Sequence, residues 1–176
     1  MKMFYGELTV QLESFECLGI MHEQCPTTLE NCMHQQHYVK QLKPINVDAY
    51  VMADLQSEVN DQTKQSFQSL LGGVAWMTQT CIAICIYVSY LQRKGKAPTV
   101  KDVRSLNRLL NWIKKMGPKL GIRYKKLSGP IKLMVITDAA FKALEYEGLA
   151  MRGCIVVAMG RVALETGKKF QCTILD

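Results

Sequence analysis

IKLMVITDAAF, residues 131–141, is the segment from which we infer most about the fold of this chain. Its first six residues, 131–136, are rich in apolar and β-branched side chains, which predicts a β-strand. The strand runs directly into Asp138, so it would carry a carboxylate to its end, with two alanines leaving room beside it. Carboxylate oxygens are the ligands that hard cations such as Mg²⁺ prefer. The structural alternative is that Asp138 forms a turn or caps a helix, as Asp commonly does after a strand.

Residues 100–116 predict the clearest helix of the chain. Thr99 can cap its first turn, Asp102 stands three residues later as in a capping box, and Gly117-Pro118 ends it. Apolar side chains recur at helical spacing along one face, which predicts that this face packs on a core. They are Val100, Val103, Leu106, Leu109, Leu110, Ile113 and Met116.

The opposite face of this helix is polar and basic, and carries Lys101, Arg104, Arg108, Asn111 and Lys115. Residues 93–126 together hold 12 basic groups against a single acid, Asp102. Cations without compensating acids fit a phosphate backbone, so we expect a nucleic acid duplex as partner. The alternative is a solvated helix face, which is how most charge runs behave. The 12 basic groups are Arg93, Lys94, Lys96, Lys101, Arg104, Arg108, Lys114, Lys115, Lys119, Arg123, Lys125 and Lys126.

The charge of the chain is concentrated in its middle third. The 176 residues carry a net charge of +7 and are 48% apolar, enough for a packed core in one domain or two small ones. Residues 1–60 have a net charge of −5, residues 61–126 of +11 and residues 127–176 of +1. This distribution predicts a local polyanion-binding surface instead of a generally basic protein.

Residues 67–92 carry no charge and are long enough to cross a membrane. However, Gly72-Gly73 interrupts the apolar density, and three polar residues, 78–80, fall at the middle of the run. We therefore favour a pair of buried helices. The alternative is a small membrane protein anchored by residues 70–91 with a basic flank.

The seven cysteines include no Cys-x-x-Cys pair, and the N-terminus lacks the pattern of a secretory signal. We therefore expect reduced thiols and a cytoplasmic or nuclear protein. Six potential metal ligands lie close together in the N-terminal part, but their spacing matches no zinc finger or knuckle, so we favour packing roles. They are Cys17, His22, Cys25, Cys32, His34 and His37.

Six segments, in this order, resemble the pol polyprotein of copia-type long-terminal-repeat retrotransposons. They are FECLGI (15–20), QQHYVKQL (35–42), FQSLLGGVAW (67–76), VRSLNRLLNWI (103–113), LGIRY (120–124) and TDAAF (137–141). The resemblance implies three regions: the end of a reverse transcriptase palm and thumb-like region (1–63), a helical basic connection (64–126) and a truncated ribonuclease H-like domain (127–176).

The resemblance implies that Asp138 is a catalytic carboxylate and metal ligand of ribonuclease H. The chemistry would be phosphodiester hydrolysis with two Mg²⁺ ions about 4 Å apart. The partners would be an RNA–DNA hybrid or another nucleic acid duplex, held by the basic groups of residues 93–126, and the remainder of the pol polyprotein.

Two departures from the family limit this function. Cys81 and Ala83 stand where many relatives carry Arg and Asp, and the chain has no Tyr-x-Asp-Asp motif. One carboxylate cannot hold two metals. The resemblance implies that the later acidic ligands lie on helices beyond residue 176. The remaining C-terminal acids are expected in turns or at strand ends; these are Glu145, Glu147, Glu165 and Asp176. We therefore expect a fragment without polymerase or nuclease turnover of its own. A noncatalytic, host-adopted nucleic-acid-binding protein is the remaining alternative.

We expect an α+β fold in which antiparallel strands and a basic helical connection are followed by an incomplete ribonuclease H-like sheet. Residues 3–34 predict short strands, and a helix begins at about Gln35 and stops at Pro44. Residues 154–159 and 170–175 predict two further strands, which would form three antiparallel strands with residues 131–136.

Overall fold

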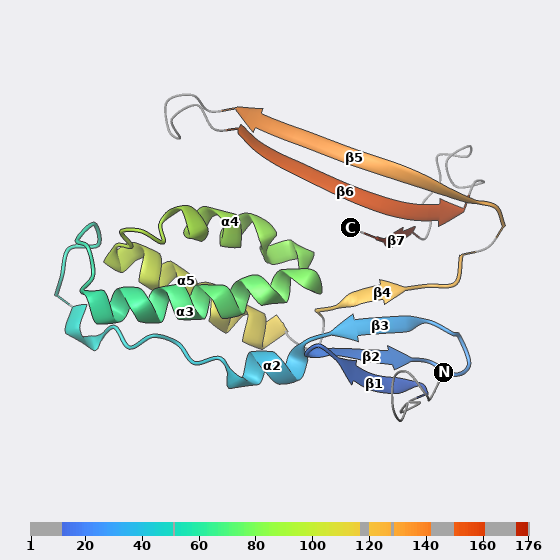
Figure 1. The fold of residues 1–176 in the computed structure, drawn as a ribbon, viewed down its shortest axis with the longest axis horizontal. Coiled ribbons are helices and arrows are strands. Elements are labelled where there is room, and N and C mark those ends of the chain that lie inside the picture. The colour runs from blue at the N-terminus through green and yellow to red at the C-terminus, as the bar shows by residue number, and fades with distance from the viewer. Residues whose placement is uncertain are drawn as a thin grey trace, which may run out of the picture. The chain divides into compact units, whose positions relative to one another are not determined.

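The computed structural model describes residues 12–50, 52–116, 120–127, 129–141, 150–160 and 172–175 (Figure 1). Helices and antiparallel strands occupy separate stretches of the chain, which confirms the expected α+β class. The elements are β1 (Ser14–Cys17), β2 (Ile20–Gln24), β3 (Asn31–His34), α2 (Gln36–Gln41), α3 (Asp61–Trp76), α4 (Cys85–Arg93), α5 (Val100–Met116), β4 (Ile122–Tyr124), β5 (Ile131–Phe141), β6 (Ala150–Gly160) and β7 (Cys172–Ile174).

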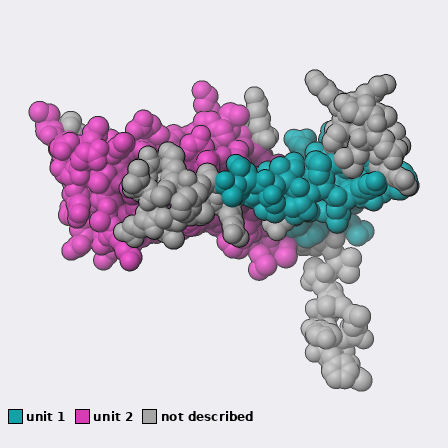
Figure 2. All heavy atoms as spheres, turned by 90° about the horizontal axis from the view of Figure 1, so that it is seen from above, with its two compact units in different colours: residues 1–15, 22–32, 123–176 teal, residues 16–21, 33–122 magenta. Residues whose placement is uncertain are grey.

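The chain forms two compact units, shown in different colours in Figure 2. Residues 16–21 and 33–122 form one unit, which contains all four α-helices of the described residues and is called the helical unit below. Residues 1–15, 22–32 and 123–176 form the other, which contains β5, β6 and β7 and is called the sheet unit.

The core of the helical unit is built by the apolar faces of α3, α4 and α5. Helix α3 begins where the side-chain oxygen of Asn60 accepts a hydrogen bond of 2.8 Å from the backbone N–H of Thr63, an N-cap that satisfies one otherwise unpaired donor. The buried residues of α3 are Phe67, Leu70, Leu71 and Val74, the stripe that helical spacing predicts. Val88 and Leu91 of α4 are buried in the same cluster.

The uncharged run of residues 67–92 is divided, as the polar residues at its middle predict. Helix α3 ends at Trp76, two short 3-10 turns follow at Met77–Gln79 and Ile82–Ile84, and α4 begins at Cys85. The hydroxyl of Thr78 donates a hydrogen bond of 2.7 Å to the carbonyl oxygen of Ala75 at the end of α3. Among the described residues, no helix is both long enough and apolar enough to cross a membrane. The predicted pair of helices is therefore confirmed.

A four-stranded sheet has the order β1-β2-β3-β4. Leu18 and Gly19 connect β1 to β2 with φ angles of +50° and +76°. Two consecutive positive φ values are typical of the tight turns that match the twist of a hairpin, and glycine adopts them at little cost. Three of the short strands predicted for residues 3–34 are confirmed within residues 14–34, while residues 3–11 lie outside the described residues.

A three-stranded antiparallel sheet has the order β5-β6-β7, which confirms the three strands expected in this part of the chain. However, β5 does not stop at Ile136, where the sequence predicts its end. It continues to Phe141 because residues 137–141 pair in register with residues 154–150 of β6. Asp138 therefore lies within a strand, opposite Gly153, and the expectation that it follows the strand is wrong.

Candidate nucleic-acid interface

Helix α5 begins with the capping box that the sequence predicts. The side chain of Asp102 accepts hydrogen bonds from the backbone N–H of Thr99 at 3.0 Å and from its hydroxyl at 2.8 Å. The Thr99 hydroxyl oxygen accepts from the N–H of Asp102 at 3.4 Å. Reciprocal bonds of this kind satisfy donors at the helix start that otherwise have no partner. They fix the first turn of the helix that carries five of the 12 basic residues of the stretch 93–126.

The two faces of α5 have opposite environments, as its periodicity predicts. One face is fully buried in the core through Val100, Val103, Leu106, Leu110 and Ile113. The other face exposes three cations, Lys101, Arg108 and Lys115, and Lys114 is exposed in the last turn of the helix. Packing of the apolar stripe therefore holds these cations toward solvent.

Arg104 differs from the other cations expected on this face. Its Nη2 donates a hydrogen bond of 3.0 Å to the backbone carbonyl oxygen of Tyr50, and its side chain is partly buried. The guanidinium therefore ties α5 to a segment 54 residues earlier in the chain. The expectation that Arg104 belongs to a freely exposed cationic ridge is corrected, because this residue also stabilises the fold.

Asp102 is the only acid of α5, and its carboxylate does not offset the exposed cations. Its side chain is 4% exposed and accepts the two hydrogen bonds from Thr99. Among its own residues, α5 therefore exposes positive charge without negative charge. Two exposed acids, Asp54 and Glu58, belong to the segment that is hydrogen-bonded to its first turn. Lys101, Arg108 and Lys115 recur every seven residues, so they lie on one side of the helix at intervals of about 10 Å. We call these three residues the α5 ridge.

The end of α4 and the turn that follows it supply three further cations with exposed side chains, Arg93, Lys94 and Lys96, which are called the cations of the α4–α5 turn below. Lys94 Nζ lies 5.9 Å from the centre of the Tyr90 ring, within the range of a cation–π contact. These residues and the α5 ridge all belong to the helical unit.

The remaining cations expected at the interface are not part of this group. Arg123, Lys125 and Lys126 have exposed side chains and belong to the sheet unit. Lys119 lies outside the described residues. The structure therefore brings together the cations of residues 93–115 in one unit and leaves those of residues 123–126 in the other.

Asp138 is exposed on β5, and its carboxylate has no acidic neighbour that would complete a metal site within the described residues. Among the same residues, no group of three or more His, Cys, Asp or Glu side chains could hold a metal ion. Glu145, Glu147, Glu165 and Asp176 lie outside the described residues. A single carboxylate does not fit a pair of Mg²⁺ ions, which needs several oxygen ligands.

The cysteines and histidines near the N-terminus take structural contacts in place of a shared site. The ring of His22 stacks on Phe15 with centres 4.7 Å apart. His37 Nε2 lies 3.2 Å from Glu16 Oε1. The Cys25 thiol lies 3.1 Å from the Thr27 hydroxyl oxygen, within hydrogen-bond distance.

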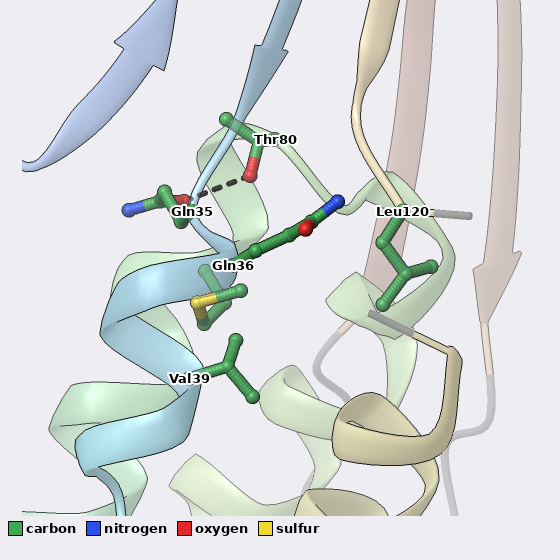
Figure 3. A pocket seen from close by; sticks show the side chains of 6 residues that line it. Gln35, Gln36, Val39, Thr80 and Leu120 are labelled. Carbon is green, nitrogen blue, oxygen red and sulfur yellow. Dashed lines mark hydrogen bonds between the residues drawn. The ribbon is translucent and has the colours of Figure 1, made fainter. Parts of the chain in front are cut away.

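The helical unit contains a small cavity beside α2, lined by six residues (Figure 3). The Gln35 side-chain oxygen accepts a hydrogen bond of 2.9 Å from the Thr80 hydroxyl at this site. The free space is about 10 Å³, which is room for one water molecule. It is too small for a nucleotide. The lining residues are Gln35, Gln36, Val39, Met77, Thr80 and Leu120.

No family model, curated protein or solved structure matches the chain. The function must therefore be argued from the residues of this chain. The sequence did not point to two residues of α5 that matter for its position and its surface. Asn107 is hydrogen-bonded to the backbone of Ile45, and Trp112 is 42% exposed between cations. The local spacing of Trp112 from Arg108 was a signal that could have found it, whereas no local signal marks Asn107.

Proposed function

We propose that the chain binds a nucleic acid duplex through the α5 ridge, Lys101, Arg108 and Lys115, together with the exposed cations of the α4–α5 turn. Lysine and arginine side chains bind phosphates and displace the cations condensed on the duplex, which supplies affinity without sequence preference. An RNA–DNA hybrid is the duplex we favour, because the chain resembles a reverse transcriptase and ribonuclease H polyprotein. The role is to position a template-primer duplex, not to cut or copy it.

The charge balance of α5 is the observation that carries this proposal. Its acid is buried in a hydrogen-bonded cap, and its ridge cations are exposed. A solvated face of an ordinary surface helix usually mixes both signs of charge. No acidic residue stands between Asp61 and Asp102, so the α4–α5 turn lacks acids of its own as well.

Within the same proposal, the chain is part of a copia-type pol polyprotein, comprising the end of the reverse transcriptase, the connection and the start of the ribonuclease H domain. The exposed position of Asp138 on a sheet supports its use as one ligand for Mg²⁺ in a complete enzyme. The other ligands would have to come from outside the described residues. The chain by itself is therefore proposed to bind without turnover.

The test is the salt dependence of binding to a 20-base-pair RNA–DNA hybrid, measured by fluorescence anisotropy with the purified full chain. The logarithm of affinity should fall with the logarithm of salt concentration, by about 0.9 for each phosphate contact. Replacing the ridge in the variant Lys101→Gln, Arg108→Gln and Lys115→Gln removes three contacts. The slope should then become shallower by roughly 2.7, three contacts at about 0.9 each.

The matched control places the same change of net charge on the exposed side of α3. The variant Gln62→Glu, Gln65→Glu and Ser69→Glu also lowers the net charge by three, at exposed positions away from the ridge. This control variant should lower the affinity by a similar factor at every salt concentration, so the slope of log affinity against log salt concentration should stay nearly unchanged. Arg104 is left intact in both variants because of its hydrogen bond to Tyr50. Equal slopes in the wild type and the ridge variant would rule out the interface.

A further inference from the structure

Trp112 stands out on α5 because it is a large aromatic side chain exposed among cations. It is 42% exposed, whereas tryptophan is on average one of the more buried residues. Arg108 stands four residues before it and Lys115 three residues after it, so all three share one side of the helix. Trp112 therefore places an aromatic surface between Arg108 and Lys115, two cations of the α5 ridge.

The second tryptophan, Trp76, has a different environment. It is 38% exposed at the end of α3, and its Nε1 lies close to the β1–β2 turn, 3.6 Å from where a Cβ on Gly19 would stand. No charged residue stands between Lys64 and Arg93, so Trp76 has no charged neighbours along its helix. Trp76 is therefore a packing residue and serves as a control for Trp112.

We propose that Trp112 stacks on an unpaired base of the bound nucleic acid while Arg108 and Lys115 contact the phosphates on either side of that base. The inference rests on the proposed function and adds a preference for a duplex with a single-stranded extension. Base–aromatic stacking combined with a cationic groove is the usual way that proteins hold single strands, and it tolerates any base sequence.

The surroundings of Trp112 favour a nucleic acid over a protein as the occupant of this surface. The exposed side chains that flank Trp112 on the same side of the helix are Arg108, four residues before it, and Lys115, three residues after it. Protein interfaces are depleted in lysine and charged groups at their centre. A partner that offers both negative charge and a flat aromatic face matches what this side of α5 presents.

The experiment compares two RNA–DNA hybrids that carry the same number of phosphates. One has a single-stranded extension of six thymidines, and the other has an extension of six abasic nucleotides. Both are titrated with the full-length wild type and with the variants Trp112→Ala, Trp112→Phe and Trp76→Phe. In the Trp76→Phe background, Trp112 is the one remaining tryptophan of the chain, so its fluorescence reports stacking directly.

The wild type and Trp76→Phe should bind the thymidine extension on the order of tenfold more tightly than the abasic one. Trp112→Ala should lose this preference and keep its affinity for the abasic hybrid, while Trp112→Phe should keep part of it. In the Trp76→Phe background, the thymidine extension should quench the Trp112 fluorescence and the abasic extension should not.

The inference is overturned if the wild type binds the two extensions equally, or if the preference survives in Trp112→Ala. If the preference survives in Trp112→Ala and this variant also changes the self-association of the free protein, Trp112 contacts a second protein chain instead of a base. If binding depends steeply on salt but does not differ between the two extensions, this inference is wrong and the proposed function stands. Absence of binding to both hybrids removes the proposed function as well.

Discussion

Asn107 anchors the cationic helix to the segment that follows α2. Its side-chain oxygen accepts a hydrogen bond of 2.9 Å from the Ile45 N–H, and its Nδ2 donates one of 2.8 Å to the Ile45 carbonyl oxygen. An amide side chain matches the donor and acceptor of one backbone residue, which neither leucine nor aspartate does. The proposed binding face of α5 is thus positioned by a residue that need not touch nucleic acid.

Asn107→Ala should lower the free energy of unfolding by about 2 kcal/mol, because it leaves a partly buried N–H and C=O without their partners. The measurement is urea denaturation followed by circular dichroism. Asn111→Ala is the control, since Asn111 is an exposed residue of the same type on the same helix. Asn111→Ala should change stability by less than about 0.5 kcal/mol. Equal losses in the two variants would contradict the anchoring role.

Four of the described cysteines have a shifted pKa, and Cys25 is the one whose thiol ionises most readily. Hydrogen bonds from the side chains of Thr27 and Thr28, and from their backbone, lower its pKa from 9.0 to about 6. Burial instead raises the pKa of Cys32, Cys81 and Cys85 above 9.0. The thiolate is the reactive form of cysteine, so Cys25 should be alkylated first at neutral pH.

The rate of alkylation of Cys25 by iodoacetamide should rise with pH to a plateau, with a midpoint at about pH 6. Below that pH the thiol is protonated and the rate falls tenfold for each pH unit. The variant Thr27→Val and Thr28→Val removes the side-chain donors that stabilise the thiolate, so the midpoint should move toward pH 9. Peptide mass spectrometry of the labelled protein separates Cys25 from the other sites, and a midpoint above pH 8 in the wild type would contradict the prediction.

At the scale of elements, α3 and α2 approach each other closely at one glycine. A Cβ added at Gly73 would lie 2.9 Å from Leu42 Cδ2 and 3.1 Å from the Tyr38 hydroxyl oxygen. A Cβ added at the adjacent Gly72 would have no atom within 4 Å. Only Gly73 is therefore required by packing, although both glycines lie inside the same helix.

Gly72→Ala should raise the free energy of unfolding by about 1 kcal/mol, the usual difference between glycine and alanine inside a helix. Gly73→Ala should gain less or become destabilising, because the new methyl group displaces Leu42 and Tyr38. Urea denaturation of the two single variants gives the comparison directly. The same stabilisation by both substitutions would mean that α2 does not restrict α3 at this point.

The sequence predicts those elements whose signals are local. Helix α5 was predictable because its cap, Thr99 with Asp102, and its apolar spacing all lie within one segment. The role of Arg104 was not, because its partner Tyr50 is 54 residues away. The predicted end of β5 at Ile136 was wrong for a related reason. The strand continues through Asp138 because it pairs with residues 150–154 of β6. Such cross-strand neighbours decide strand formation more than local preference does.

Most of the net positive charge of the molecule belongs to one of its two compact units. The helical unit contains 12 basic and 6 acidic residues, so it holds +6 of the total net charge of +7. The sheet unit is nearly balanced, with 10 basic and 9 acidic residues. The sequence indicated a cationic middle third, but it did not indicate that residues 1–15 and 22–32 belong to the same unit as residues 123–176. That grouping depends on contacts between distant segments.

A polyanion should therefore stabilise the helical unit selectively. Hydrogen exchange followed by mass spectrometry, with the RNA–DNA hybrid at 100 times its Kd, should show stronger protection of α5 peptides and unchanged protection of β5 and β6. Binding at this hybrid concentration stabilises the folded state by about 2.7 kcal/mol. Amides of α5 that exchange only when the unit unfolds should therefore exchange roughly 100-fold more slowly. The ridge variant with Lys101, Arg108 and Lys115 replaced by glutamine should show little change at the same hybrid concentration. Equal protection of β5 and α5 in the wild type would place the duplex on the sheet unit as well, and would contradict a binding surface confined to the helices.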